Sequence, residues 1–251
     1  MAEATQAARV IAVTGASRGI GAAIALELAG RGYEVGCLTR KGAGIETQAV
    51  PQALAQRCIN LRCDVEDEAS VKAALAALAR EHGRIDGLVN NAGVHLGGKS
   101  ADFPTAEYEQ VMDTNARSVF IGCREAYPYL SGKGGTIVNI GSFFDKLGVK
   151  RNLAYCASKA AVGAITRCLA VEWASKAIRV LNVAPGYIET ELNAEALKAD
   201  ALRAFLEQRI PAGRPGSAQA VARLVASLFD EDIAFLTGET IYLDGGQGMA
   251  H

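Results

Sequence analysis

The stretch that most constrains this fold is Val10–Gly21, which reads VIAVTGASRGIG. The apolar run Val10–Val13 leads into a glycine-rich turn, and an alanine-rich segment follows in which apolar residues recur every four positions. This order predicts a buried strand, a turn and an amphipathic helix. The turn glycines are Gly15, Gly19 and Gly21, and the helical apolar residues are Ile20, Ile24 and Leu28.

The glycine turn also predicts a nucleotide site. Glycines let the backbone approach a pyrophosphate closely, and the N-terminus of a helix offers free N–H groups and a partial positive charge. The spacing G-x-x-x-G-x-G differs from the G-x-G-x-x-G of the commoner dinucleotide fingerprint. A tight connection without a ligand is the plain alternative, but a place at the first strand-to-helix junction favours the nucleotide.

Strand and helix candidates alternate about seven times along the 251 residues, without a repeat or a linker. The further strands are expected at Tyr33–Leu38, Ile59–Val65, Ile85–Val89, Gly135–Ile140, Ile178–Val183 and Thr240–Leu243. The further helices are expected at Asp67–Glu81, Thr105–Leu130, Leu153–Ala174 and Ala218–Phe229. The pattern predicts an α/β fold: one domain over residues 1–251, with a doubly wound, Rossmann-type parallel sheet of about seven strands and helices on both faces. Ligands of such sheets bind beyond the carboxyl ends of the strands.

Composition narrows the function classes. The formal net charge is −1, so a basic nucleic-acid surface is not expected. The six cysteines form no C-x-x-C pair and lie in apolar settings, which predicts buried free thiols, and the three histidines lack metal-ligand spacing, so no metal site is expected. No signal peptide or membrane-spanning run is recognisable, and we expect a soluble, cytoplasmic protein.

Four residues suggest proton-transfer chemistry. Tyr155 and Lys159 are four positions apart on a predicted helix and share a face, so an ammonium can lie near the phenol and lower its pKa. Ser142 ends a predicted strand on the ligand-facing edge, within reach of that phenol. Asn115 lies inside a predicted helix between apolar neighbours and is expected to face inward. On the pair alone, an exposed tyrosine and lysine that merely flank a helix would be favoured, but Ser142 changes the balance toward a catalytic site.

These residues, together with TGASRGIG, NNAG at 90–93, Pro185-Gly186 and Thr190, resemble the short-chain dehydrogenase/reductase family from Val10 to Gly246. The resemblance implies that Tyr155 is the general acid/base. It implies that Lys159 lowers the pKa of this tyrosine and holds ribose hydroxyls, that Ser142 polarises the substrate oxygen, and that Asn115 positions a water for proton relay. A reduced nicotinamide would then deliver hydride to a carbonyl carbon while Tyr155 protonates its oxygen.

The resemblance also implies where the cofactor lies. Asp64 and Val65 match positions that contact adenine, Asn91 and Gly93 should line the cofactor, and Thr190 should bond the carboxamide. The whole set expected at the cofactor is Gly15, Ser17, Arg18, Gly19, Ile20, Gly21, Thr39, Arg40, Asp64, Val65, Asn91, Ala92, Gly93, Tyr155, Lys159, Pro185, Gly186, Ile188 and Thr190.

The end of the second strand predicts the choice between nicotinamides. A carboxylate there would bind the ribose 2′-hydroxyl and repel a 2′-phosphate, whereas this chain has Thr39 followed by Arg40 and Lys41. Arg18, in the glycine turn, can approach the same phosphate, and guanidinium groups suit phosphate through their planar fork of donors. A solvated charged loop is the alternative. Two arginines that converge with no acid nearby favour NADPH.

The substrate is less defined. Within the family the chain resembles 3-oxoacyl carrier-protein reductases, but after Ser142 it departs from their Gly/Asn/Gln-rich loop with FFDK at 143–146 and KRN at 150–152. The phenylalanines could wall an apolar pocket, and Lys150 and Arg151 could meet an anionic group. We expect reduction of a ketone such as a 3-oxoacyl thioester. Dehydrogenation of a sugar, hydroxy acid or cyclic alcohol stays open, as does a non-catalytic NADPH-binding regulator, although a regulator would not need all four catalytic residues.

Two expectations concern the surroundings of the site. The segment at about 187–210, rich in Ala, Glu and Lys, is expected to form a substrate lid over the cleft, with a plain surface helix as the alternative. The helices at Thr105–Leu130 and Leu153–Ala174 carry surplus apolar positions, including Val119, Val162, Ile165, Leu169 and Trp173. A homodimer or homotetramer through two-fold axes is therefore expected.

Overall fold

Seven parallel strands form the central sheet in the order β3-β2-β1-β4-β5-β6-β9. This computed structural model describes residues 8–46, 50–190, 200–230 and 233–249. The strands of the sheet are β1 (Val10–Thr14), β2 (Glu34–Thr39), β3 (Cys58–Arg62), β4 (Gly87–Asn90), β5 (Gly135–Ile140), β6 (Ile178–Pro185) and β9 (Thr240–Leu243). The order reverses at β1, which pairs with β2 on one side and with β4 on the other, so a crevice is expected at the carboxyl end of β1.

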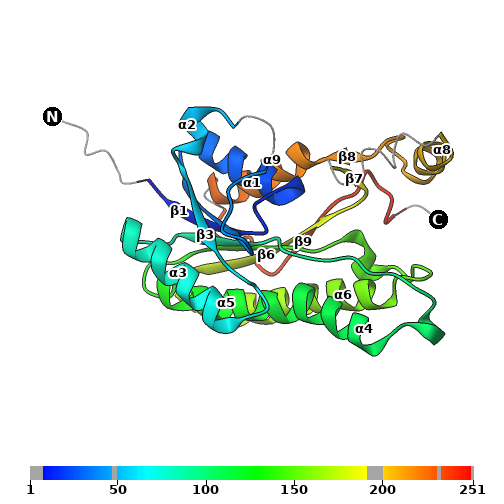
Figure 1. The fold of residues 1–251 in the computed structure, drawn as a ribbon, viewed down its shortest axis with the longest axis horizontal. Coiled ribbons are helices and arrows are strands. Elements are labelled where there is room, and N and C mark those ends of the chain that lie inside the picture. Colours follow the sequence, from blue (N-terminus) through cyan, green and yellow to red (C-terminus); the bar gives the residue numbers. More distant parts are fainter. Residues whose placement is uncertain (1–7, 47–49, 191–199, 231–232, 250–251) are drawn as a thin grey trace.

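Helices cover both faces of this sheet (Figure 1), as predicted for a doubly wound fold. In Figure 1, α1, α2 and α9 lie on one face and α3, α4, α5 and α6 on the other, while α8 lies beside the short strands β7 and β8. The helices are α1 (Gly19–Gly30), α2 (Gln52–Ala55), α3 (Glu68–His82), α4 (Thr105–Met112), α5 (Ser118–Leu130), α6 (Leu153–Trp173), α8 (Asp200–Arg209) and α9 (Ala218–Asp230).

The apolar strand at the start of the chain supplies both halves of the core. Ile11 and Val13 belong to the core on the α1 and α9 face, whereas Val10 and Ala12 belong to the core beneath α3, α5 and α6. Alternate residues of a strand point to opposite faces, so a continuous apolar run is what a strand covered on both sides requires. The run that defines the sequence motif therefore anchors the glycine turn rigidly between two helical layers.

Several element boundaries differ from those predicted. β3 ends at Arg62 rather than at Val65, so Asp64 and Val65 lie in the loop beyond the strand. The predicted helix Thr105–Leu130 is continuous but contains a π-helical turn at Asp113–Arg117, which hydrophobic periodicity does not reveal. Such turns insert a residue into a helix and often mark functional sites.

The region after β6 forms a strand pair that the sequence did not predict. Ile188–Glu189 (β7) pairs in parallel with Gly216–Ser217 (β8), so the chain leaves the main sheet at Pro185 and forms a second, two-stranded sheet. Two-residue strands carry too short an alternation to be recognised in a sequence. Of the predicted lid at 187–210, residues 191–199 lie outside the described part of the chain, and α8 accounts for its end.

The expectation of surplus apolar positions on two helices was wrong in part. Val119, Val162 and Trp173, expected to be free for an oligomer, are buried in the protein's own core, and Ile165 and Leu169 pack against that core. The exposed apolar side chains of these helices are Phe120, Leu153 and Val171 instead.

The cysteine side chains differ in exposure. All six cysteines are free, as predicted, but Cys168 is exposed and only Cys37, Cys63 and Cys123 are buried. Across the described ranges, no group of three or more His, Cys, Asp or Glu is arranged to hold a metal ion. No described helix is long and apolar enough to cross a membrane.

Candidate active site

The glycine turn exposes bare backbone at positions where a side chain would clash or strain the chain. Gly15 has a φ of +64°, and a Cβ on Gly21 would lie 2.2 Å from the carbonyl oxygen of Gly15. Helix α1 begins at Gly19 after Arg18, whose side chain makes no capping hydrogen bond. The first N–H groups of α1 are therefore not satisfied by that side chain, and the backbone around them offers the close approach that a pyrophosphate needs.

Asn91 ties the loop after β4 to this turn. Its Nδ2 donates hydrogen bonds to the carbonyl oxygens of Thr14 (3.0 Å) and Gly15 (3.2 Å). In return, the Oγ1 of Thr14 accepts from the N–H groups of Asn91 (2.9 Å) and Ala92 (3.0 Å). The carboxyl ends of β1 and β4 thus form one rigid floor at the point where the strand order reverses.

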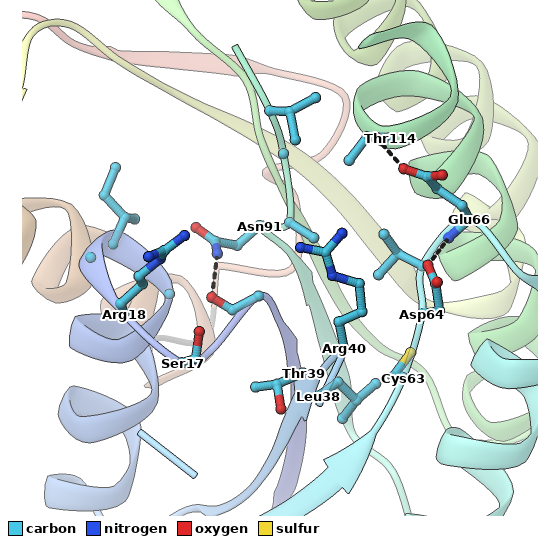
Figure 2. A pocket seen from close by; sticks show the side chains of 18 of the residues that line it. Ser17, Arg18, Leu38, Thr39, Arg40, Cys63, Asp64, Glu66, Asn91 and Thr114 are labelled. Atoms are coloured by element: carbon cyan, nitrogen blue, oxygen red, sulfur yellow. Dashed lines mark hydrogen bonds between the residues drawn. The ribbon is translucent and has the colours of Figure 1, made fainter. Parts of the chain in front are cut away.

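A cleft of about 380 Å³ opens above this floor (Figure 2). It brings together most of the residues predicted at the cofactor, namely Gly15, Ser17, Arg18, Gly19, Ile20, Gly21, Thr39, Arg40, Asp64, Val65, Asn91, Ala92, Gly93 and Thr190. The sequence did not predict Leu38, Cys63, Glu66, Gln110 and Thr114, which also line it, and Val94, expected at the substrate, lines it as well. Leu38 and Cys63 could have been found from the rule that ligands meet strand ends, whereas Gln110 and Thr114 come from a neighbouring helix and carry no sequence signal.

The charges of this cleft are more mixed than predicted. Arg18 and Arg40 are exposed and appear on opposite sides of Ser17 and Asn91 in the view of Figure 2. The prediction of no acid nearby is wrong, because the loop after β3 brings Asp64 and Glu66 to the same cleft. Among the residues described, neither acid forms an ion pair with Arg18 or Arg40.

The two acids have other contacts. Asp64 Oδ1 accepts from the N–H of Glu66 at 3.1 Å, and the Glu66 carboxylate accepts from the hydroxyl of Thr114 (Figure 2). Thr39, which lines the cleft, uses its hydroxyl within the protein, because this group donates to the carbonyl oxygen of Ala43 at 2.9 Å. Its side chain therefore fixes the loop that carries Arg40.

A second cleft of about 550 Å³ adjoins the first, and Ile20, Asn91, Gly93, Val94 and Thr190 line both. It contains the predicted residues Ser142, Tyr155, Lys159, Pro185, Gly186 and Ile188. One continuous groove thus runs from the glycine turn to the predicted catalytic residues. A groove of this kind suits an extended dinucleotide with a reacting substrate at one end.

Asn115 lies beneath the groove rather than on its wall. It is fully buried in the π-helical turn, its Oδ1 accepts from the N–H of Val94 at 2.8 Å, and its Nδ2 donates to the carbonyl oxygen of Val94 at 2.8 Å. The same Nδ2 donates to the hydroxyl of Ser158 at 3.1 Å. Asn115 therefore holds the loop after Gly93 against α6.

Lys159 is a buried residue of α6 whose side chain reaches the carboxyl end of β5. Its Nζ donates to the carbonyl oxygen of Ile140 at 2.8 Å and lies 5.7 Å from the centre of the Tyr155 ring. Burial lowers the pKa of Lys159 to about 8, because the charged form loses its hydration. The lysine is thus predominantly a cation at neutral pH, next to the tyrosine.

Tyr155 and Ser142 form the other half of this arrangement. Ser142 is buried just after β5, and its Oγ accepts from the N–H of Phe144 at 3.3 Å. Burial raises the pKa of Tyr155, and a hydrogen bond with the Ser142 hydroxyl partly opposes that shift. The expectation of a lowered tyrosine pKa is therefore wrong for this structure, since desolvation outweighs the groups that stabilise the phenolate.

Comparisons with known proteins agree with this geometry. Residues 15–247 match a family model described as Enoyl-(Acyl carrier protein) reductase. The chain is 38% identical to 2-(R)-hydroxypropyl-CoM dehydrogenase of Xanthobacter autotrophicus, with 94% of this chain and 97% of that protein covered. It is 37% identical to the 3-oxoacyl-[acyl-carrier-protein] reductase FabG of Escherichia coli, with 96% and 98% covered.

Solved structures are equally similar. The crystal structure of a putative 2-deoxy-d-gluconate 3-dehydrogenase from Agrobacterium tumefaciens, with bound NADP, has a TM-score of 0.84 and 34% identity, and covers 96% of this chain and 97% of that one. The family match and these similarities extend over nearly the whole chain, including the glycine turn and the residues from Asn115 to Lys159. The chain belongs to the short-chain dehydrogenase/reductase family.

Proposed function

We propose that this protein reduces a ketone with NADPH, and that the reverse oxidation of a secondary alcohol uses the same groups. The observation that carries the proposal is the shared groove, in which Tyr155, Ser142 and Lys159 stand at one end and the glycine turn at the other. A nicotinamide cofactor supplies a hydride when it is bound there. The protein must then bind the cofactor, orient the carbonyl and provide one proton.

The groove fits such a cofactor. The bare backbone around Gly15 and Gly21 suits a pyrophosphate, and the loops that end β3 and β4 provide walls for an adenosine. Arg18 and Arg40 support the choice of NADPH, because they are the cations on this cleft and Thr39 stands where a carboxylate would select NADH. The similar structure with bound NADP supports the same choice.

Proton transfer follows from the residues at the other end. Because burial raises the pKa of Tyr155, its phenol stays protonated at neutral pH and can donate that proton to a carbonyl oxygen. The Ser142 hydroxyl, which interacts with the phenol, can turn its single proton to the substrate oxygen and stabilise the negative charge that develops there. Lys159 keeps a positive charge beside both, and Asn115 would position the water that returns a proton to the tyrosine.

For the substrate, we propose two candidate classes. The similarity to FabG over 96% of the chain supports the 3-oxoacyl thioester expected from the sequence. The replacement of the usual small polar residues after Ser142 by Phe143 and Phe144, which line the second cleft, favours a cyclic alcohol or ketone instead. A non-catalytic NADPH-binding regulator is disfavoured because the complete set of proton-transfer residues lies on the groove or directly beneath it.

We also propose the surroundings in which this reaction takes place. Residues 1–251 would form one domain with a lid at about 187–210, in a cytoplasmic homodimer or homotetramer. The exposed apolar residues Phe120, Leu153 and Val171 on α5 and α6 support association through these helices.

The test is to measure NADPH oxidation with a panel of ketones that includes a 3-oxoacyl thioester, a sugar ketone and cyclic ketones. Turnover by the wild type and its loss in Tyr155→Phe would support the proposal. Binding of NADPH without oxidation by any carbonyl in the panel would support the regulator instead.

A further inference from the structure

We infer that the second cleft selects an uncharged ketone with a flat ring next to its carbonyl. This inference rests on the proposed ketone reduction and adds the substrate class. It is carried by a cluster of aromatic side chains beside Tyr155, by the shortage of charge on the wall of the cleft, and by loops that hold the wall in place.

Aromatic rings extend outward from the catalytic phenol. The ring centre of Phe144 lies 5.9 Å from that of Tyr155 and 6.3 Å from that of Tyr187, and both pairs meet edge to face at 84° and 90°. Phe143 lies 4.6 Å from Phe144 and 5.5 Å from Tyr187. Aromatic pairs of this geometry attract each other. A flat ring of a substrate can pack against these side chains in the same way, either edge to face or offset-stacked.

The positions of these rings are set by the main sheet. Phe143 and Phe144 directly follow Ser142 in a 3-10 turn at Phe143–Lys146 and are 4% and 8% exposed. Tyr187 follows β6, the neighbour of β5, and is 36% exposed. Two buried rings and one half-open ring therefore stand on adjacent strand ends, beside the hydroxyl that would bind the carbonyl oxygen.

Among the described residues of its wall, this cleft offers no free charged partner for an anionic substrate. Of the described residues that line it, Lys159 is the one with a full charge, and its Nζ already donates to Ile140. Lys150 and Arg151, which the sequence suggested for an anionic group, are exposed and do not line the cleft. The charge of Arg209 acts electrostatically on Tyr187, but Arg209 does not line the cleft. A carboxylate or phosphate beside the carbonyl would lose its hydration without compensation.

Two loops hold the polar side of the cleft in place. The ring of His95 lies 4.7 Å from that of Tyr155, and its Nε2 is hydrogen-bonded to the Oδ1 of Asn152. The N–H of Gly98 donates to the carbonyl oxygen of Arg151 at 2.9 Å, and Arg151 has a φ of +66°. These contacts fix the two loops against the cleft, and a cleft with a fixed wall favours a rigid ring over a flexible chain.

The test compares ketones that differ in one feature. Ethyl benzoylformate carries a ring and no charge. Benzoylformate has a free carboxylate in place of the ethyl ester, and ethyl pyruvate has a methyl group in place of the ring. The acetoacetyl thioester of N-acetylcysteamine represents an uncharged straight chain. We expect kcat/KM with NADPH to be at least about tenfold higher for ethyl benzoylformate than for each of the other three.

Variants locate the preference in the aromatic wall. Phe144→Ala should lower kcat/KM for ethyl benzoylformate about tenfold and change that for ethyl pyruvate less than about threefold. Tyr187→Ala, at a half-open position that leaves no core cavity, should act in the same direction. Phe235→Ala is the matched control, because Phe235 is fully exposed in the loop before β9, at the opposite end of the strands. An equal loss for both esters in the two pocket variants would overturn the inference.

A binding measurement separates this inference from the proposed reaction. Tyr155→Phe loaded with NADPH is titrated calorimetrically with the same ketones, and the dissociation constant for ethyl benzoylformate should be the lowest. That order of binding, without turnover of any ketone by the wild type, would support the pocket and overturn the proposed reduction. Turnover with a preference for the anion, the methyl ketone or the thioester would support the reduction and overturn the pocket.

Discussion

Lys159 and Ile140 are joined by a 2.8 Å hydrogen bond from the Nζ of the lysine to the carbonyl oxygen that ends β5. This bond holds the ammonium of Lys159 5.7 Å from the centre of the Tyr155 ring. The sequence brought Tyr155 and Lys159 together only through their spacing on one helix. The sheet thus sets the position of the charge that the tyrosine senses, and the strand that continues into Ser142 carries the acceptor.

The first prediction concerns the proton donor. Tyr155→Phe removes only the transferable proton, so ketone reduction should fall at least about 100-fold while NADPH binding stays nearly unchanged. Single-turnover kinetics and a fluorescence titration with NADPH measure the two effects. Activity above about a tenth of the wild type would assign the proton to another group.

The second prediction concerns pH and stability. The pKa of Lys159 is about 8 in the folded chain and about 10.4 in an unfolded one, so between these values the unfolded chain binds more protons. The unfolding free energy of the wild type should therefore rise with pH across this window, by up to about 3 kcal/mol from this residue, and the full cost of burying the cation applies below pH 8.

Lys159→Met removes the titrating group and isolates its effect from other lysines and tyrosines. Urea unfolding of both proteins at pH 7, 9 and about 10.4 measures the difference. As the pH rises, the unfolding free energy of the wild type should increase relative to that of Lys159→Met. Parallel profiles of unfolding free energy against pH would contradict the prediction.

The third prediction concerns cofactor choice. Arg40→Ala should raise KM for NADPH between about tenfold and a hundredfold and leave KM for NADH almost unchanged, because a charge-assisted contact contributes about 1.5–3 kcal/mol. Arg62→Ala is the matched control, since Arg62 is exposed at the end of β3 and does not line the cleft. A wild type that prefers NADH would show Arg40 to be a solvated loop charge.

A companion substitution tests the same choice from the opposite side. Thr39→Asp should reverse the preference toward NADH, because its carboxylate repels the 2′-phosphate and accepts the ribose hydroxyl. Thr39 also bonds to Ala43, so Thr39→Ser serves as the control that keeps this hydrogen bond. Saturation curves with both cofactors decide the outcome.

The fourth prediction concerns the glycine turn. Gly21→Ala would place its Cβ 2.2 Å from the carbonyl oxygen of Gly15 and 2.4 Å from the Nδ2 of Asn91, so the turn must open. Binding of NADPH should weaken at least about tenfold. Gly132→Ala, at a position with open space and no positive φ, is the control, and equal affinities in the two variants would contradict the role of Gly21.

The fifth prediction concerns assembly. Val171 is 83% exposed on α6, and light scattering at micromolar concentration should show a dimer or a tetramer for the wild type. Val171→Glu should shift the particle toward a smaller mass, because a charge on an apolar interface loses its hydration. A stable monomer in the wild type would reject the association.

By itself, the sequence determined the order of strands and helices along the chain and the functional residues that follow the strands. A continuous apolar run such as Val10–Val13 must be buried on both faces, and the alternation of strands with helices covers it on both sides in a doubly wound sheet. The glycine turn, Ser142, Tyr155 and Lys159 were found because each follows a strand or shares a helix face, and these are local relationships that spacing records.

Only the tertiary structure decided how distant residues share one site. It brought Glu66 to the cleft that Arg18 and Arg40 line. It also made Asn115 a link between Val94 and Ser158, and it placed Phe144 between Tyr155 and Tyr187. It also raised the pKa of Tyr155, against expectation. Spacing along the chain records neither burial nor the meeting of separate elements, and desolvation and contacts across the sheet depend on both.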